Sequence, residues 1–223
     1  MNKAMTHAQT TEESSPRTAG GRWPSDWLAP RIPFFYGWVV IGVAFVTMAI
    51  GVNSRTAFSL LFPPILDEFG WARGVTAAAF SIGFVASVAV APFTGLLMDR
   101  LGPRFVVSMG AVSVSAGLVL TTRMSTPLEL YLTLGALVVG GSVFMSYIGH
   151  SAFLPRWFSR RRGLAIGIAF SGVGVGSIVL FPLTQEIIDT DGWRAACMAL
   201  AGLIVVTIIP VSYTHLRAHE TQR

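Results

Sequence analysis

The sequence predicts an all-α membrane protein, a bundle of six transmembrane helices made of two inverted three-helix repeats. Three observations lead to this prediction. The 223 residues are 52% hydrophobic and 12% charged, whereas soluble domains carry about a quarter charged residues. The apolar residues form six runs near the ~20 residues that a helix needs to cross a bilayer. Finally, one of the six apolar runs and the loop after it recur later in the chain at a fixed distance.

Residues 1–33 are predicted to form a disordered cytoplasmic tail. They are polar and are interrupted by Ser, Thr, Gly and Pro, so they cannot bury enough apolar surface to fold. They do not form a secretory signal, because the apolar run after them starts too late and is too long. Residues 31–38 then place Arg31 and four aromatic residues at the entry to the first span, which is typical of an interfacial anchor.

Residues 34–210 are predicted to form the six-helix unit. Its connections are short, so successive helices are antiparallel neighbours. Pro92 and Pro182 fall inside spans, where neighbouring helices can satisfy the backbone groups that a proline frees. Gly163, Gly167, Gly172 and Gly176 follow a small-xxx-small spacing, which favours close helix packing. The six predicted spans are residues 37–61, 75–98, 105–122, 128–154, 163–183 and 195–210.

Lysine and arginine are distributed unevenly between the two sides of this bundle. Ten lie on the side of the tail and only three on the other side, and cytoplasmic loops carry the excess of Lys and Arg. The sequence therefore predicts a multi-pass protein of the plasma (inner) membrane with a cytoplasmic N-terminus. The net charge of +5 thus reflects topology rather than a nucleic-acid partner, and Arg160–Arg162 are also expected to contact anionic lipid head groups. The ten residues are Lys3, Arg17, Arg22, Arg31, Arg100, Arg104, Arg156, Arg160, Arg161 and Arg162; the three are Arg73, Arg123 and Arg194.

An internal repeat appears when the chain is compared with itself at an offset of 90 residues. Ten identities fall within residues 77–104 and share the pattern Pro-x-Thr-x4-Asp-x2-Gly-x-Arg, more than the roughly two or three expected by chance in so biased a composition. The two copies lie on opposite sides of the membrane, which predicts inverted repeats of spans 1–3 and 4–6. The alternative is an accidental likeness between helices rich in small residues. The identical residues in the first copy are Ala79, Phe80, Ser81, Val85, Ser87, Pro92, Thr94, Asp99, Gly102 and Arg104.

Arg55 is the most informative single residue. It lies about six residues, or ~9 Å, beyond the middle of the first span, where a charge is costly unless it faces a polar cavity or a partner. Thr47, Gly51, Arg55 and Ser59 recur every four residues, so one helix stripe is small or polar and suits a transport path. Two interpretations fit: Arg55, with Asn53 nearby, binds a carboxylate substrate, or Arg55 snorkels to the interface.

His150 and Tyr147 stand near the cytoplasmic end of the fourth span. His150 is a candidate proton relay because the charge of histidine changes near neutral pH, and the alternative is a histidine that is simply hydrogen-bonded. Tyr147, one turn earlier, either lines the same path or packs, and packing is the favoured interpretation.

No enzyme chemistry is indicated. The sequence has no nucleotide-binding loop, no metal-ligand spacing and no nucleophile–base constellation. The one cysteine, Cys197, excludes an internal disulfide framework. We expect no cofactor, no metal and no catalytic residue.

The loop after the second span has a signature of its own. Gly95, Asp99, Arg100, Gly102 and Arg104 resemble the pattern G-x-x-x-D-R-x-G-R-R of the major facilitator superfamily, with Pro103 in place of the usual basic residue. The resemblance implies a latch that holds one face of a transporter shut, and the alternative is a topology-fixing turn with a local ion pair. Residues 35–38, 62–71 and 156–167 resemble more narrowly the monocarboxylate-transporter and oxalate/formate-exchanger branch.

This resemblance implies the N-terminal half of a 12-helix secondary active transporter for small organic anions. Such a carrier works by alternating access and is driven by protons or by exchange. The expected partners are the organic anion, protons, membrane lipids and the C-terminal six-helix half. The alternatives are a carrier for another solute, such as a drug, nitrate or a sugar-like molecule, or a membrane sensor or scaffold that does not transport. Residues 211–223 resemble a non-native read-through tail and are left out of this reasoning.

Overall fold

The computed structural model describes the backbone of residues 36–147, 150–151 and 162–220 and the side chains of most of them. The predicted tail and the loop with Arg156, Arg160 and Arg161 lie outside these residues. Every regular element that the structure describes is a helix, which agrees with the all-helical prediction.

The first predicted span is divided into two helices, α1 (Tyr36–Thr56) and α2 (Phe58–Phe69), that meet at Ala57. Pro63 and Pro64 lie inside α2, and they lack the N–H groups that would bond to carbonyls one turn earlier. The predicted end at residue 61 is wrong, because the helix continues as far as Phe69 and stops at Gly70, whose φ is +63°. A left-handed glycine of this kind is a common helix terminator.

The second and third spans are α3 (Arg73–Leu101) and α4 (Pro103–Thr121), and both agree with prediction within a few residues. Gly102 joins them with a φ of +81°, and its N–H donates to the carbonyl of Met98 at 3.1 Å. Pro103 opens α4 at a position where its missing N–H has no intrahelical partner to lose. The turn between the two helices is therefore one residue long.

The fourth span is irregular. It begins with α5 (Pro127–Leu130), continues as the π-helical η2 (Tyr131–Gly140) and the 3₁₀ turn η3 (Ser142–Met145), and breaks at Ser146, which is extended. The prediction of one uninterrupted span over residues 128–154 is therefore wrong. Periodic apolar sequence does not reveal such changes of helix type, which often accompany functional sites.

The fifth and sixth spans are α7 (Arg162–Asp191) and α8 (Trp193–Glu220), joined at Gly192 with a φ of +85°. The predicted end of the fifth span at residue 183 is wrong. Polar residues after it remain helical, and the Gln185 side chain donates to Asp189 at 2.8 Å, one turn further on. The sixth helix does not stop at residue 210 as predicted but continues to Glu220; the origin of residues 211–223 stays a prediction.

Five of the described helical stretches are long and apolar enough to cross a membrane. The described part of α8 adds a shorter apolar helix, Trp193–Thr207. These helices account for a multi-pass membrane protein by their length and composition. The five stretches are Val40–Phe69, Arg73–Leu101, Pro103–Thr121, Pro127–Met145 and Gly163–Asp191.

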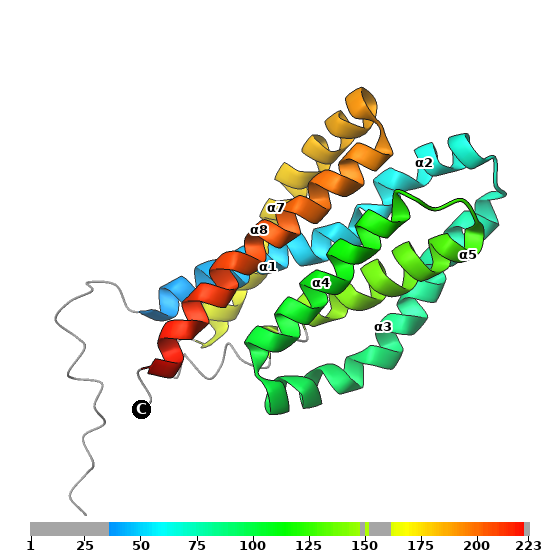
Figure 1. Cartoon of the computed structure of the whole chain (residues 1–223). Coiled ribbons are helices and arrows are strands. Elements are labelled where there is room, and N and C mark those ends of the chain that lie inside the picture. Colours follow the sequence, from blue (N-terminus) through cyan, green and yellow to red (C-terminus); the bar gives the residue numbers. More distant parts are fainter. Residues whose placement is uncertain (1–35, 148–149, 152–161, 221–223) are drawn as a thin grey trace, which may run out of the picture. The chain divides into compact units, whose positions relative to one another are not determined.

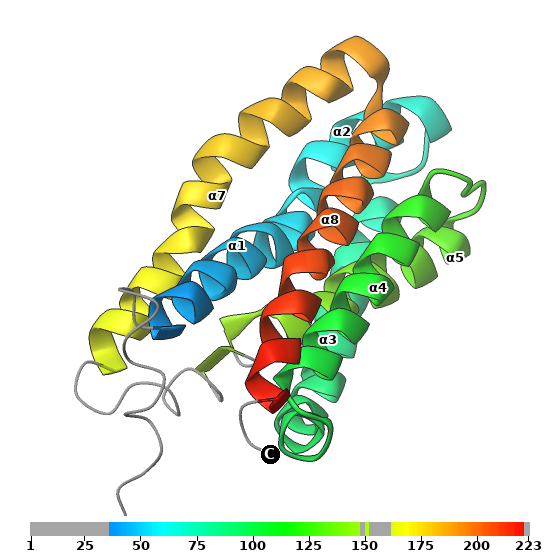
Figure 2. The same ribbon diagram turned by 60° about the vertical axis from the view of Figure 1, so that its left-hand side comes forward.

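Within residues 36–220, the helices run lengthwise beside one another (Figure 1). α1 packs mainly on α7, α3 on η2, and α4 on α8 (Figure 2). Glycines bring them together: a Cβ atom built on Gly83 of α3 would lie 2.5 Å from Cβ of Val139, and one on Gly176 of α7 would lie 2.8 Å from the carbonyl oxygen of Ala49. Of the predicted glycine series, Gly172 and Gly176 make such approaches, whereas Gly163 and Gly167 face open space.

Candidate functional site

Arg55 lies near the midpoint of the first membrane-spanning stretch. Val40–Phe69 is helical apart from the step at Ala57, which places Arg55 fifteen residues after its start and fourteen before its end. The predicted depth of Arg55, six residues beyond the middle of residues 37–61, stays a prediction. At 1.5 Å per residue, either end of this stretch is roughly 20 Å away along the helix, so Arg55 lies well inside the stretch.

The guanidinium of Arg55 is held by an aromatic ring. Its central carbon lies 5.3 Å from the centroid of the Phe84 ring on α3, within the range of a cation–π interaction. Among the described residues Arg55 forms no ion pair and no side-chain hydrogen bond. The ring contact leaves its N–H donors unused, so the guanidinium keeps the planar fork that binds carboxylates.

Phe84 belongs to a row of aromatic rings that links α3 to α2. The Phe80 ring meets Phe84 edge-on at 4.8 Å and stacks on Phe58 at 5.0 Å, and Phe58 lies 5.9 Å from Phe62. Phe84 was not predicted as a site residue. The available signal was the spacing of Phe80 and Phe84, which places them one turn apart on one face of a helix.

Asn53 lies in the interface between α1 and α7 and is buried. Its Nδ2 donates to the carbonyls of Ala49 at 2.6 Å and Val173 at 3.0 Å, and its Oδ1 accepts from the Ser177 hydroxyl at 2.8 Å. Both amide hydrogens are thus used inside the protein. Asn53 contacts α7, whereas Arg55 contacts α3, so the structure does not bring these two predicted residues together, and binding of substrate by Asn53 stays a prediction.

His150 is buried against α1. Its Nδ1 lies 3.0 Å from the carbonyl oxygen of Ser146, and its Nε2 lies 2.8 Å from Oγ1 of Thr47. A carbonyl only accepts, so Nδ1 carries the hydrogen of that bond, while the Thr47 hydroxyl also donates to the carbonyl of Val43 at 2.9 Å. Thr47 belongs to the same helix stripe as Arg55, two turns or roughly 12 Å away, so the candidate relay contacts that stripe.

Tyr147 is 41% exposed, although it lies in the same short segment as the buried His150. Its ring packs edge-to-face on Phe170 of α7, with the ring centroids 4.8 Å apart. This contact fits the packing interpretation and leaves part of the ring accessible. The predicted role in substrate binding stays a prediction.

The predicted loop motif forms the junction between α3 and α4. Asp99 and Arg100 are exposed in the last turn of α3, Arg104 is half-buried in the first turn of α4, and Gly102 forms the turn. Gly95, two turns before Gly102, has no atom within 4 Å of the position where a Cβ would lie. The structure therefore brings the five residues to one end of the bundle, and the proposed latch would act from that end.

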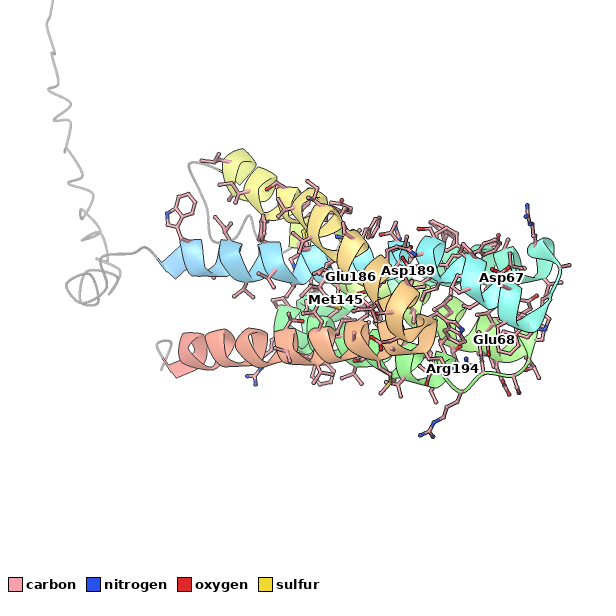
Figure 3. All side chains as sticks on the ribbon, turned by 90° about the horizontal axis from the view of Figure 1, so that it is seen from above. Asp67, Glu68, Met145, Glu186, Asp189 and Arg194 are labelled. Atoms are coloured by element: carbon pink, nitrogen blue, oxygen red, sulfur yellow. The ribbon has the colours of Figure 1, made fainter. Side chains whose placement is uncertain are left out.

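A second charged cluster joins three helix ends at the junction between α7 and α8 (Figure 3). Arg194 forms two hydrogen bonds with the carboxylate of Glu68 at 2.6 and 2.7 Å, and its Nε donates to the carbonyl of Thr122 at 3.1 Å. The Trp193 indole N–H donates to the same carboxylate at 2.7 Å. Arg194 is the residue equivalent to Arg104 in the repeat. Its ion pair with Glu68 was not predicted, because only the fold brings this residue of α2 close to Arg194.

Comparisons with known proteins agree on one family. The sequence profile described as Major Facilitator Superfamily matches residues 41–223. Monocarboxylate transporter 11 of Homo sapiens is 36% identical over 177 residues, covering 78% of this chain and 37% of that protein. Monocarboxylate transporter 3 of Rattus norvegicus is 34% identical over 170 residues, covering 76% of this chain and 34% of that protein. The chain therefore spans little more than a third of the length of these relatives.

Proposed function

Because the chain belongs to the major facilitator superfamily, we propose that it forms part of a secondary active transporter for small organic anions of the monocarboxylate type. The observation that carries this proposal is Arg55, a cation at the middle of a membrane-spanning stretch with no acidic partner among the described residues. Relatives named monocarboxylate transporters support the same choice. The protein is thus a transporter rather than an enzyme.

The chemistry of Arg55 suits a carboxylate. A carboxylate offers two coplanar oxygens to the guanidinium fork, and the pair forms two parallel hydrogen bonds. In the low-dielectric middle of a membrane such a pair is worth far more than in water. The bound anion also supplies the countercharge that an arginine at this depth requires.

We infer that spans 1–3 and 4–6 are inverted repeats, and details of the structure support this inference. At an offset of 90 residues, Gly102 matches Gly192 in its positive φ, and both N–H groups donate one turn back at 3.1 Å. The Ser87 hydroxyl donates to the carbonyl of Gly83, and its equivalent Ser177 donates to that of Val173. Both serines also bond across to a neighbouring helix.

The helix packing follows the same rule. The repeat makes spans one, two and three equivalent to spans four, five and six. The contact of span one (α1) with span five (α7) therefore corresponds to a contact of span four (η2) with span two (α3), and both contacts are observed. The pair of α4 with α8, spans three and six, maps onto itself. Alternating access in such folds relies on repeats of this kind.

The positive-inside rule supports a plasma (inner) membrane location with a cytoplasmic N-terminus and with the α3–α4 junction on the cytoplasmic side. The remaining partners follow from that arrangement: membrane lipids around the helices, and a C-terminal six-helix half that completes the site and meets the Asp99 latch. Transport is coupled to protons or to anion exchange. His150, bonded to the Arg55 stripe through Thr47, is the candidate proton relay.

The proposal is tested in proteoliposomes that contain the full-length carrier. Counterflow of radiolabelled acetate is measured for the parent protein, Arg55→Ala, Arg55→Lys and the matched control Arg123→Ala, which removes an exposed arginine from a loop. Arg55→Ala is expected to lower the rate at least tenfold because a buried charge pair is lost. Arg55→Lys is expected to retain part of the transport rate, because lysine offers a point charge without the planar fork. Unchanged uptake in both Arg55 variants would refute the assignment, and solute binding without counterflow would indicate a sensor.

A further inference from the structure

We propose that Phe84 is a specificity-determining residue of this carrier, and this inference rests on the proposed function. Its ring holds the Arg55 guanidinium in place and forms the wall on which the hydrocarbon part of the substrate packs. The site therefore prefers carboxylates with an aromatic or branched apolar body over short ones such as acetate.

The Phe84 ring is fixed from behind by other rings. Phe80 meets it at 89°, close to a perpendicular arrangement, and Phe80 in turn lies nearly parallel to Phe58. Phe58 is buried, at 7% exposure, at the start of α2. Ring pairs of this geometry contribute beyond the area that they bury, so the orientation of Phe84 is set before any ligand arrives.

The outer side of the Phe84 ring is open. Phe84 is 42% exposed, and Val88, one turn further along α3, is 71% exposed. Residues four apart lie on the same helix face, so Phe84 and Val88 form an apolar strip beside the guanidinium. A carboxylate that binds Arg55 thus places the rest of the molecule against this strip.

The alternative occupant of this strip is a lipid chain, and Arg55 argues against it. A guanidinium inside a membrane-spanning helix is unfavourable beside lipid tails. The face that Arg55 and Phe84 share is therefore expected to border the transport path. There the ring attracts the cation through its π-electrons and leaves the N–H donors to the substrate.

The preference follows from the apolar area that a substrate brings. Each buried methylene changes affinity roughly fourfold, so acetate gains little from an apolar wall, while phenylacetate and 3-methylbutanoate gain much. An aromatic body also stacks with Phe84 in the offset or edge-on geometry that rings prefer. The aryl acid therefore depends most on Phe84.

The experiment compares the full-length carrier with Phe84→Leu, Phe84→Tyr and the control Phe93→Leu in proteoliposomes. Phe93 is 60% exposed on the same helix, so its replacement removes the same ring at a distance from Arg55. Radiolabelled acetate and phenylacetate are the probes, and KM and maximal rate are measured for each. Phe84→Leu is expected to raise the KM ratio of phenylacetate to acetate about five- to twentyfold, while Phe84→Tyr and Phe93→Leu leave it within about twofold.

The outcomes separate this inference from the proposed function. If the parent transports acetate and loses it in Arg55→Ala, but Phe84→Leu leaves the KM ratio unchanged, the role of Phe84 is overturned and the transporter assignment stands. A parent carrier with a lower KM for acetate than for phenylacetate would also overturn the role of Phe84 and leave the transporter assignment standing. If the parent moves neither acid, the proposed function itself fails. The Phe84 side chain is 42% exposed, so Phe84→Leu and Phe84→Tyr are both expected to leave the fold intact.

Discussion

Arg194 and Arg55 differ in the number of protein groups that contact their guanidinium groups. Arg194 binds a carboxylate, a backbone carbonyl and a tryptophan ring at the end of the bundle. Arg55 lies at the middle of a membrane-spanning stretch, and among the described residues it has only the ring of Phe84. Arg194 thus donates from all three of its nitrogens to protein groups, whereas Arg55 retains its donors, as the proposed binding of a carboxylate requires.

The Glu68–Arg194 pair is expected to stabilise the fold modestly. Its side chains are 40% and 45% exposed, and exposed ion pairs contribute about 0.5–1 kcal/mol. A double-mutant cycle with Glu68→Ala and Arg194→Ala, followed by unfolding of the purified chain in detergent, should give a coupling free energy of that size. The coupling should shrink in 1 M salt, where the Debye length falls to about 3 Å. Asp67→Ala, an exposed neighbour, is the control, and strictly additive effects would show that the pair contributes nothing.

Residues of the candidate site could be predicted only where their own chemistry was unusual in context. Arg55 stood out because a charge inside an apolar run is costly. Phe84 did not, because its importance depends on the rotation and crossing of α3 against α1, which no local pattern contains. The hydrogen bonds of Asn53 to α7 depend in the same way on packing between helices that are distant in sequence.

At the scale of elements, hydropathy predicts where helices cross a membrane but not where they end. The predicted ends at residues 61 and 183 were too early, because the helices continue through Phe69 and Asp191. The end of α3 before Gly102 was predicted within a few residues, whereas the ends of α2 before Gly70 and of α7 before Gly192 were not, although all three glycines have a positive φ. The breaks at Ala57 and Ser146 were not predicted, because neither is marked by a proline or glycine at the break.

The crossing of α3 and η2 provides a test of element packing. A Cβ on Gly83 would lie 2.8 Å from the carbonyl oxygen of Gly135 and 2.5 Å from Cβ of Val139, so Gly83→Ala forces the helices apart. We expect the free energy of unfolding in detergent to fall by about 1–3 kcal/mol. Gly95→Ala on the same helix meets nothing within 4 Å and should be neutral or slightly stabilising, because alanine favours helix. Equal effects of the two replacements would contradict this description of the crossing.

At the scale of the whole molecule, the repeat and the charge distribution require each other. Two copies of one pattern lie at opposite ends of the bundle, at the α3–α4 and α7–α8 junctions (Figures 1 and 2). A duplicated unit with three spans must insert its second copy upside down, because an odd number of crossings reverses direction. The all-helical membrane fold was predictable from composition and apolar runs, whereas the inverted repeat stays a proposal.

The orientation is tested by cysteine labelling in intact cells. Ser125→Cys lies between α4 and α5, and Leu101→Cys lies at the end of α3; both parent residues are exposed, and neither change alters the count of Lys and Arg. The native Cys197 is buried and should stay silent. A membrane-impermeant maleimide should label the first variant directly and the second only after permeabilisation. The reverse pattern would place the N-terminus outside.

The step at Ala57 separates α1 from α2, which is held by two of its neighbours. α2 is anchored by Glu68 to α8 and by Phe58 to α3, while α1 extends 21 residues on the other side of the break. At 1.5 Å per residue this arm is about 30 Å long, so a tilt of only ~10° moves its tip by about 5 Å. Arg55 lies beside the pivot and would scarcely be displaced. A tilt of α1 about this step would therefore move the start of the helix and leave Arg55 almost stationary.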